Sequence, residues 1–283
     1  NKLEVLDAVG EKAMAYFAPL NTRDLSDAAL TRQVAVLRQI GENRNDQGRY
    51  PEAMRSFLAA YEIAEVLAAR HPDNGEMVFE RAQAEYWVGF VLRKRGEVAA
   101  MTEWLVRYRD SGAALVALNP AEPRWQEELA WGHHNLAVVD LDAGNLDDAR
   151  RGFLGELAML QQRAAAKPGD LELQYRIADA NSWLGSIAER SGNLGEAATR
   201  CADVVARMEA LMKAEPSNAN WRLKLADALA LHASVLTITG ERSAAMAQRG
   251  HAKAMFDALV AGDPKNRTLL KRALNNRLKE SGL

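Results

Sequence analysis

The sequence AVVDLDAGNLDDARRGF, residues 137–153, carries the pattern that decides the fold. A small residue, Ala137, is followed after seven positions by Gly144, after five more by Ala149 and after four more by Phe153. The same order occurs earlier in the chain, at Gly41, Gly48, Ala53 and Phe57. The two copies lie 96 residues apart, which is two periods of 48.

The period of 48 residues runs through the chain. It is marked by five glycines, Gly48, Gly96, Gly144, Gly192 and Gly240. It is marked equally by five prolines, Pro72, Pro120, Pro168, Pro216 and Pro264. Glycine averages ~7% and proline ~5% of ordinary chains, so this agreement in phase is not chance. A fixed period of this length predicts a solenoid, a stack of one repeated supersecondary unit.

Each period holds two arms of 23 residues, and both are predicted to be helices. In the arm after Gly48, apolar residues recur at steps of three and four: Phe57, Ala60, Tyr61, Ala64 and Leu67. The phase glycines suit left-handed C-terminal caps, and the phase prolines cannot continue a helix. Near the prolines stand residues that cap helix N-termini, among them Asn74, Asn218 and Asp263.

The helix boundaries follow this punctuation. A first helix is expected from about Lys2 to Phe17, within an N-terminal segment 1–20. Five repeats follow at about 25–72, 73–120, 121–168, 169–216 and 217–264. Their helix pairs are expected at 25–47 and 50–70, 75–95 and 98–118, 122–143 and 146–166, 170–191 and 194–214, and 218–239 and 242–261. A last helix, about 266–280, keeps Leu270, Leu274 and Leu278 on one face. It is expected to form a polar cap over 265–283.

Between the glycines and prolines, columns of small residues keep the same phase. One is Gly41, Gly89, Ala137, Gly185 and Ala233; another is Ala82, Ala130, Ala178 and Ala226. Small side chains let helices approach closely, so these columns are predicted to form the packing seam. Five residues after each proline stands a large apolar residue that should close the loop: Met77, Trp125, Leu173, Trp221 and Leu269.

The order of small residue, glycine, alanine and aromatic residue resembles the tetratricopeptide repeat, a helix-turn-helix of 34 residues. Here Phe57 and Pro72 are separated by 15 positions, about seven more than in that family, and the other arm is longer by the same amount. The resemblance implies an all-α fold, an α-solenoid of antiparallel helix pairs wound as a right-handed superhelix, with about 12 helices. Such lengthened arrays are similar to regions that follow effector domains in bacterial signalling and defence proteins.

Composition narrows the classes of function. The chain of 283 residues is 48% hydrophobic and 26% charged, with a net charge of -2, which argues against a nucleic-acid partner. No apolar run reaches the roughly 20 residues needed to span a membrane. The single cysteine, Cys201, fits a reducing cytoplasm. The chain starts at Asn1 without an initiator methionine, so we expect it to be a piece of a longer protein.

Candidate chemical groups have structural explanations. His133 and His134 are adjacent, so on a helix they point about 100° apart and make a poor metal pair. His232 occupies an apolar position of the repeat and is predicted to be a core histidine with a hydrogen-bond partner. Cys201 stands where Phe57 and Phe153 stand, which predicts a buried thiol. The sequence therefore predicts no catalytic residue, no metal and no cofactor, and the chain is not expected to be an enzyme.

In the family that the sequence resembles, the first helix of each pair lines a concave groove. Transferred by phase, one row of groove positions is Arg38, Tyr86, His134, Ser182 and Ala230; a second is Gln83, Trp131, Asp179 and Asp227; a third is Arg93, Leu141, Glu189 and Thr237. The predicted partner-binding residues are Gln83, Tyr86, Arg93, Trp131, His134 and Asp179. Aromatic residues and arginine are common anchors of interfaces. The alternative is that the longer helices bury Trp131 against a neighbour.

The sequence therefore favours a non-catalytic interaction or sensor scaffold that presents a groove to a protein or peptide. A second hypothesis is a self-associating or autoinhibitory arm, which holds an attached effector inactive or forms a homo-oligomer. A third is the sensing of a small molecule, although no phosphate-binding loop supports it.

Overall fold

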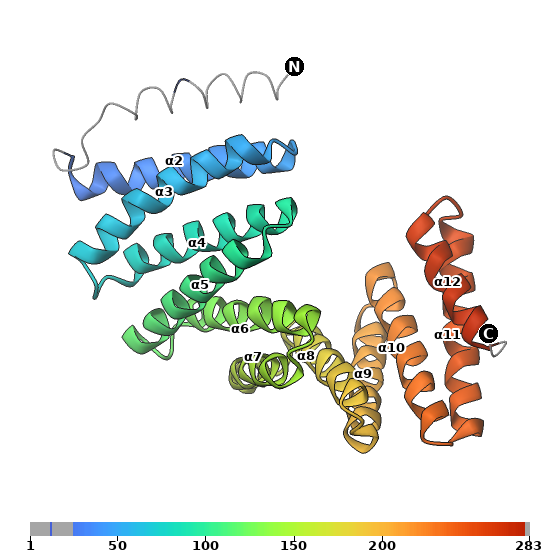
Figure 1. The fold of residues 1–283 in the computed structure, drawn as a ribbon. Helices are drawn as coiled ribbons and strands as arrows, with labels where there is room; N and C mark the ends of the chain where they lie inside the picture. The colour runs from blue at the N-terminus through green and yellow to red at the C-terminus, as the bar shows by residue number, and fades with distance from the viewer. Residues whose placement is uncertain (1–11, 13–24, 281–283) are drawn as a thin grey trace. The chain divides into compact units, whose positions relative to one another are not determined.

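The computed structural model describes residue 12 and residues 25–280, and the described part is helical without a strand (Figure 1). The helices are α2 (Asp27–Asp46), α3 (Tyr50–Arg70), α4 (Gly75–Arg95), α5 (Val98–Leu118), α6 (Pro123–Ala143), α7 (Leu146–Ala166), α8 (Leu171–Arg190), α9 (Leu194–Ala214), α10 (Ala219–Ile238), α11 (Arg242–Gly262) and α12 (Arg267–Glu280). Each begins and ends within two residues of its predicted position. The predicted helix Lys2–Phe17 lies outside the described residues, except for residue 12.

The phase glycines end the first helix of each pair in a left-handed conformation. Gly48, Gly96, Gly144, Gly192 and Gly240 have φ between 74° and 88°. At each one the next residue's N–H reaches back to a carbonyl five residues earlier, as Asn193 does to Ala188 at 2.8 Å. This bond closes a Schellman motif and satisfies carbonyls that the helix end leaves unpaired. The second helix then begins two residues after the glycine.

The phase prolines end the second helix of each pair. The residue before each proline leaves the helical region, as at His71 with φ -132° and ψ 65°, because a following proline disfavours that region. The next helix is capped two residues after the proline. Asn74, Asp170, Asn218 and Asn266 accept hydrogen bonds there from backbone N–H groups. The expected cap at Asp263 was therefore wrong: Asp263 ends α11, and Asn266 caps α12.

The predicted seam of small residues is buried. The alanines at 82, 130, 178 and 226 are at most 1% exposed. A Cβ added to Gly41 would lie 2.5 Å from the ring of Phe57, so that ring occupies the space a side chain at position 41 would need. The Phe57 ring in turn stacks on Trp87 at 5.3 Å, and Phe153 stacks on Trp183 at 5.5 Å, one helix pair further along in each case.

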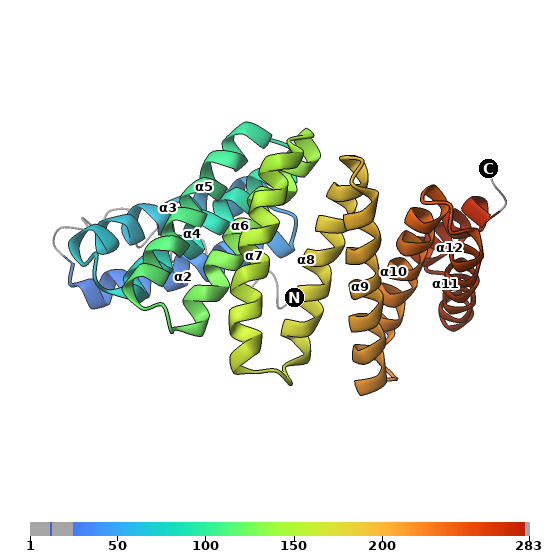
Figure 2. The same ribbon diagram turned by 90° about the horizontal axis from the view of Figure 1, so that it is seen from below.

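Contacts divide the chain into two compact units, 1–139 and 140–283, with the division inside α6. In each unit, helices pack mainly on their neighbours in sequence, and the paired helices run antiparallel (Figures 1 and 2). Each unit has apolar clusters of its own, such as Val34, Leu37 and Ala64 in unit 1 and Leu225, Leu229 and Phe256 in unit 2. The prediction that the repeats form one right-handed superhelix stays a prediction.

The terminal helix α12 packs with a face other than its leucine stripe. Leu269, Ala273 and Asn276 are buried against the rest of unit 2, whereas Leu270 and Leu274 are 42% and 55% exposed. The outer face of α12, which was expected to be polar, therefore also carries two leucines. The buried stripe 269–273–276 follows the helical steps of four and three as well as the leucine stripe does, so periodicity alone could not choose between them.

Candidate functional site

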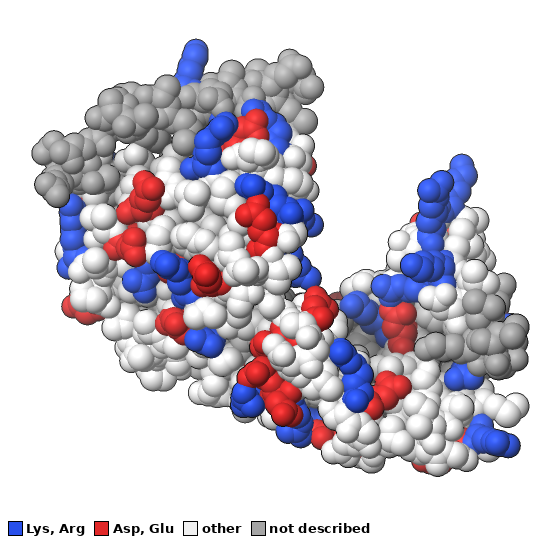
Figure 3. Space-filling model, viewed as in Figure 1, with Lys and Arg blue, Asp and Glu red and all other residues white. Residues whose placement is uncertain are grey.

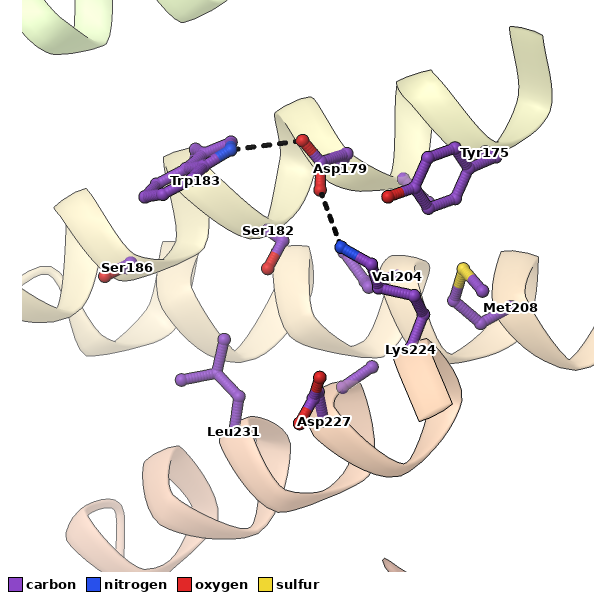
Figure 4. A pocket seen from close by; sticks show the side chains of 12 residues that line it. Tyr175, Asp179, Ser182, Trp183, Ser186, Val204, Met208, Lys224, Asp227 and Leu231 are labelled. Atoms are coloured by element: carbon purple, nitrogen blue, oxygen red, sulfur yellow. Dashed lines mark hydrogen bonds and ion pairs between the residues drawn. The ribbon is translucent and has the colours of Figure 1, made fainter. Parts of the chain in front are cut away.

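A half-open pocket lies between α8, α9 and α10 in unit 2 (Figure 4). It has a volume of about 300 Å³. Its apolar lining comes from all three helices: Ala178, Val204, Met208, Ala228 and Leu231. Its polar lining comes from α8 and α10, which are the first helices of two successive pairs: Tyr175, Asp179, Ser182, Trp183, Ser186, Lys224 and Asp227. A cleft with an apolar base and a few converging polar groups is the usual form of a binding site.

The polar rim of the pocket is organised by ion pairs between successive first helices. The Lys224 Nζ lies 4.0 Å from Asp179 Oδ1, and the Trp183 indole donates to Asp179 Oδ2 at 3.1 Å (Figure 4). Asp227, on the other side of Lys224, is paired with Arg272 of α12. Negative and positive side chains therefore alternate across α8, α10 and α12. Such pairs hold the rim side chains in place before any partner arrives.

Burial and neighbouring charges shift the pKa values at the rim. Burial raises the pKa of the Asp227 carboxyl, although the charges of Arg272 and Lys224 oppose the rise. Burial by itself would lower the pKa of the Lys224 ammonium, but Tyr175, Asp179 and Asp227 together raise it above its ordinary value. The lysine therefore stays charged at neutral pH. The Tyr175 ring centroid lies 5.6 Å from Lys224 Nζ, a cation–π distance.

Of the predicted partner-binding residues, only Asp179 lines this pocket. Gln83 and Tyr86 belong to unit 1, where they are half-buried in packing. The Gln83 amide donates to Glu128 at 2.8 Å, and the Tyr86 ring meets Tyr108 at 5.5 Å. Burial raises the pKa of Tyr86. These two side chains therefore join α4 to its neighbours.

The remaining predicted residues lie on the surface of unit 1. Trp131 is 37% exposed, so the alternative that buries it against a neighbour is wrong. Its ring meets His134 edge to face at 5.3 Å, one turn further along α6. Arg93 is exposed in the last turn of α4. Whether this surface binds a partner stays a prediction.

The other reactive groups have the environments of structural residues. Burial raises the pKa of the Cys201 thiol to about 11, which agrees with its predicted role as a small core residue. His232 is half-buried, and burial lowers its pKa. Its expected hydrogen bond is not seen at Nδ1, which has no partner among the described residues. Nor do three His, Cys, Asp or Glu side chains of the described part lie together as a metal site would require.

The repeat pattern did not indicate most of the pocket residues, including Tyr175, Trp183 and Lys224. One signal could have found the rim. Polar partners on successive first helices recur 45 residues apart, in Gln83–Glu128, Asp179–Lys224 and Asp227–Arg272. This spacing is three residues short of the period, so it joins positions about one helical turn apart on neighbouring repeats.

Comparison with models of protein families gives no match, and neither does comparison with curated proteins. Solved structures do resemble this chain. BtubC (BKLC) from P. vanneervenii has a TM-score of 0.66 at 16% identity, over 92% of each chain. The C-terminal part of a TPR repeat-containing protein from Cytophaga hutchinsonii has a TM-score of 0.51 at 15% identity, over 96% of this chain and 82% of that one. The fold is that of a tetratricopeptide-like α-solenoid.

At this identity, the likeness establishes the fold and leaves function to the residues of this chain. No described helix is both long enough and apolar enough to cross a membrane.

Proposed function

We propose that this chain is a non-catalytic interaction module that binds a protein or peptide through its first helices. The observation that carries the proposal is the pocket between α8, α9 and α10. Its volume of about 300 Å³ is at the lower end of small-ligand sites. That size suits one bulky side chain of a partner better than a large cofactor.

The chemistry of the pocket favours a bulky apolar anchor. Met208, Val204 and Leu231 offer an apolar surface, and Trp183 and Tyr175 offer aromatic edges. The charges of Asp179 and Lys224 lie at the rim, where they can pair with polar groups on either side of the anchor. Interfaces commonly combine a buried apolar anchor with such a polar rim. Because the rim is already held by its own ion pairs, little ordering is needed on binding.

A second contact surface on unit 1 is part of the proposal. It comprises Trp131, His134 and Arg93, whose aromatic and cationic character supports an interface. The resemblance to lengthened repeats supports a wider setting, in which the module is the sensor or scaffold arm of a larger bacterial signalling or defence protein in the cytoplasm. The net charge of -2 supports a protein rather than a nucleic-acid partner.

Selection from a random peptide library displayed on phage, with the full chain as bait, tests the proposal. We expect the selected peptides to share a bulky apolar residue. Ser182→Trp places an indole in the pocket, so it should lower the affinity for these peptides by about tenfold or more, as loss of an interface anchor does. Fluorescence polarisation with labelled peptides measures the effect.

Two comparisons make the result specific. Ser217→Trp adds the same indole to an exposed loop of the same unit and should leave binding unchanged. Trp131→Ala and Arg93→Glu report on the unit 1 surface. Peptides that bind wild type and Ser182→Trp equally would remove the pocket from the proposal. If the peptides also bind the Trp131→Ala and Arg93→Glu variants as tightly as wild type, the unit 1 surface is removed from the proposal too.

A further inference from the structure

The outward face of α12 combines exposed leucines with exposed cations. Leu270 is 42% exposed and Leu274 is 55% exposed. Arg267 and Lys271, which lie on the same side of the helix at steps of three and four, are exposed too. Figure 1 and Figure 2 show α12 beside α11 at the end of unit 2. Among the residues that the structure describes, none covers these two leucines.

The repeat shows what normally covers this face. Leu274 stands at the position of Ala82, Ala130, Ala178 and Ala226, which are all at most 1% exposed. Ala82 lies in one apolar cluster with Tyr108 and Leu115 of α5. Ala226 lies in a cluster that includes Ala252 and Phe256 of α11. In both repeats the cover is an antiparallel amphipathic helix, so a helix is the shape that fits α12.

The side chain at this position sets how closely a docked helix can approach α12. An alanine lets the covering helix approach closely, whereas Leu274 projects further from α12. A helix that docks here must therefore receive the leucine in a groove between its own side chains, as in packing of ridges into grooves.

The positive charge of α12 also determines which kind of helix can dock on it. Between Asp263 and Glu280 the sequence has six cations, Lys265, Arg267, Lys271, Arg272, Arg277 and Lys279, and no acid. Figure 3 shows Lys and Arg gathered over the start of α12. Arg272 is paired with Asp227 on the inner side. A second copy docked by the same face would bring like charges together, which disfavours it.

We propose that the outward face of α12 is a docking surface for an acidic amphipathic helix of a partner protein. Its two leucines supply the apolar contact, and Arg267 and Lys271 pair with carboxylates along the edge of that helix. This surface is separate from the pocket between α8 and α10, so either proposal can fail without the other.

The chain itself supplies a probe. A fluorescent peptide with the sequence of α5, Val98–Leu118, keeps Tyr108 and Leu115, which share an apolar cluster with Ala82 of α4. Arg107→Glu and Arg109→Glu in this peptide give it an acidic edge. We expect it to bind the full-length chain, and a peptide of the same composition in scrambled order to bind at least about tenfold more weakly, because the apolar face is lost.

Variants of the protein locate the contact. Leu270→Ser with Leu274→Ser should lower the affinity for the acidic peptide by about tenfold or more. Arg267→Glu with Lys271→Glu should weaken it similarly and strengthen a version of the peptide whose acids are replaced by lysine. Ile238→Ser removes another exposed apolar side chain of unit 2 and should change nothing. Ser182→Trp should also leave this binding intact. Circular dichroism verifies that every variant is folded.

Three outcomes would overturn the proposal. Equal binding of the ordered and scrambled peptides would leave only unspecific charge attraction. Binding to phosphatidylserine vesicles that both α12 variants abolish, without binding of the peptide, would assign the face to an anionic membrane. A dimer in sedimentation velocity that Leu270→Ser with Leu274→Ser abolishes would assign it to a second copy of the chain.

Discussion

At the scale of single residues, the fold depends on glycines that are required for their backbone conformation. Gly192 has φ 76° and no heavy atom within 4 Å of the place where a Cβ would lie. Space is therefore available for a side chain, and the restriction comes from the left-handed backbone itself. The same holds at the other four phase glycines, so the most regular feature of the sequence is a conformational one.

Substitution of Gly192 separates conformation from space. Gly192→Ala should lower the free energy of unfolding by about 1 kcal/mol, since a Cβ is disfavoured at positive φ. Gly250→Ala has equally open surroundings but lies inside α11, and it should raise the free energy by about 0.5–1 kcal/mol through helix propensity. Urea unfolding of both variants compares them. Effects of the same sign would contradict the conformational explanation.

At the scale of elements, buried polar groups join neighbouring helices at positions that are apolar in some repeats. Glu85 of α4 is 3% exposed and occupies the position of Leu37 and Leu229, which is His133 and Asn181 in the two repeats between. The Ser111 hydroxyl of α5 donates to its carboxylate at 2.6 Å, and Arg81 Nε lies 3.6 Å away. Burial raises the pKa of Glu85 to about 7 in spite of these partners. At neutral pH the carboxyl is thus near half-protonation.

This shift predicts how stability depends on pH. Between the ordinary pKa of 4.5 and about 7, the folded protein holds a proton that the unfolded chain has lost. The Glu85 contribution to stability therefore falls as pH rises through this window. Glu85→Gln removes the buried charge, so it should stabilise the protein at pH 8 by about 1–3 kcal/mol and have little effect at pH 5.

Urea unfolding at the two pH values measures this difference. Glu103→Gln, an exposed glutamate on the adjoining helix α5, serves as the control and should shift stability by less than about 0.5 kcal/mol at either pH. Equal destabilisation by Glu85→Gln at both pH values would show that its hydrogen bonds outweigh the cost of its charge.

At the scale of the whole molecule, stability is a sum of contacts between neighbours. Within each unit the helices contact mainly the helices next to them in sequence. In such arrays, opening starts where a helix has the fewest neighbours. In unit 2, α10 packs on both α9 and α11, whereas the main partner of α12 is α11.

Hydrogen exchange monitored by mass spectrometry tests this picture. Amides of α12 should exchange at least about tenfold faster than those of α10, because local opening there breaks fewer contacts. The proposed acidic helix should slow exchange in α12 when it binds. Uniform protection throughout unit 2 would mean that the unit opens as a single cooperative block.

The sequence by itself determined the period, the helix pairs and their ends, because caps and turns depend on residues within a few positions of one another. Gly144 and Pro168 need no distant partner to end a helix. The sequence also identified the buried alanine columns, since the helices of every repeat pack closely at the same positions. Only the tertiary structure decided which polar side chains meet across repeats. Lys224 joins Asp179 in a rim, Gln83 is engaged by Glu128, and α12 turns Leu270 and Leu274 outward. These arrangements depend on how far each helix rotates against its neighbours, and a hydrophobic pattern fixes that rotation only to within about one face of a helix.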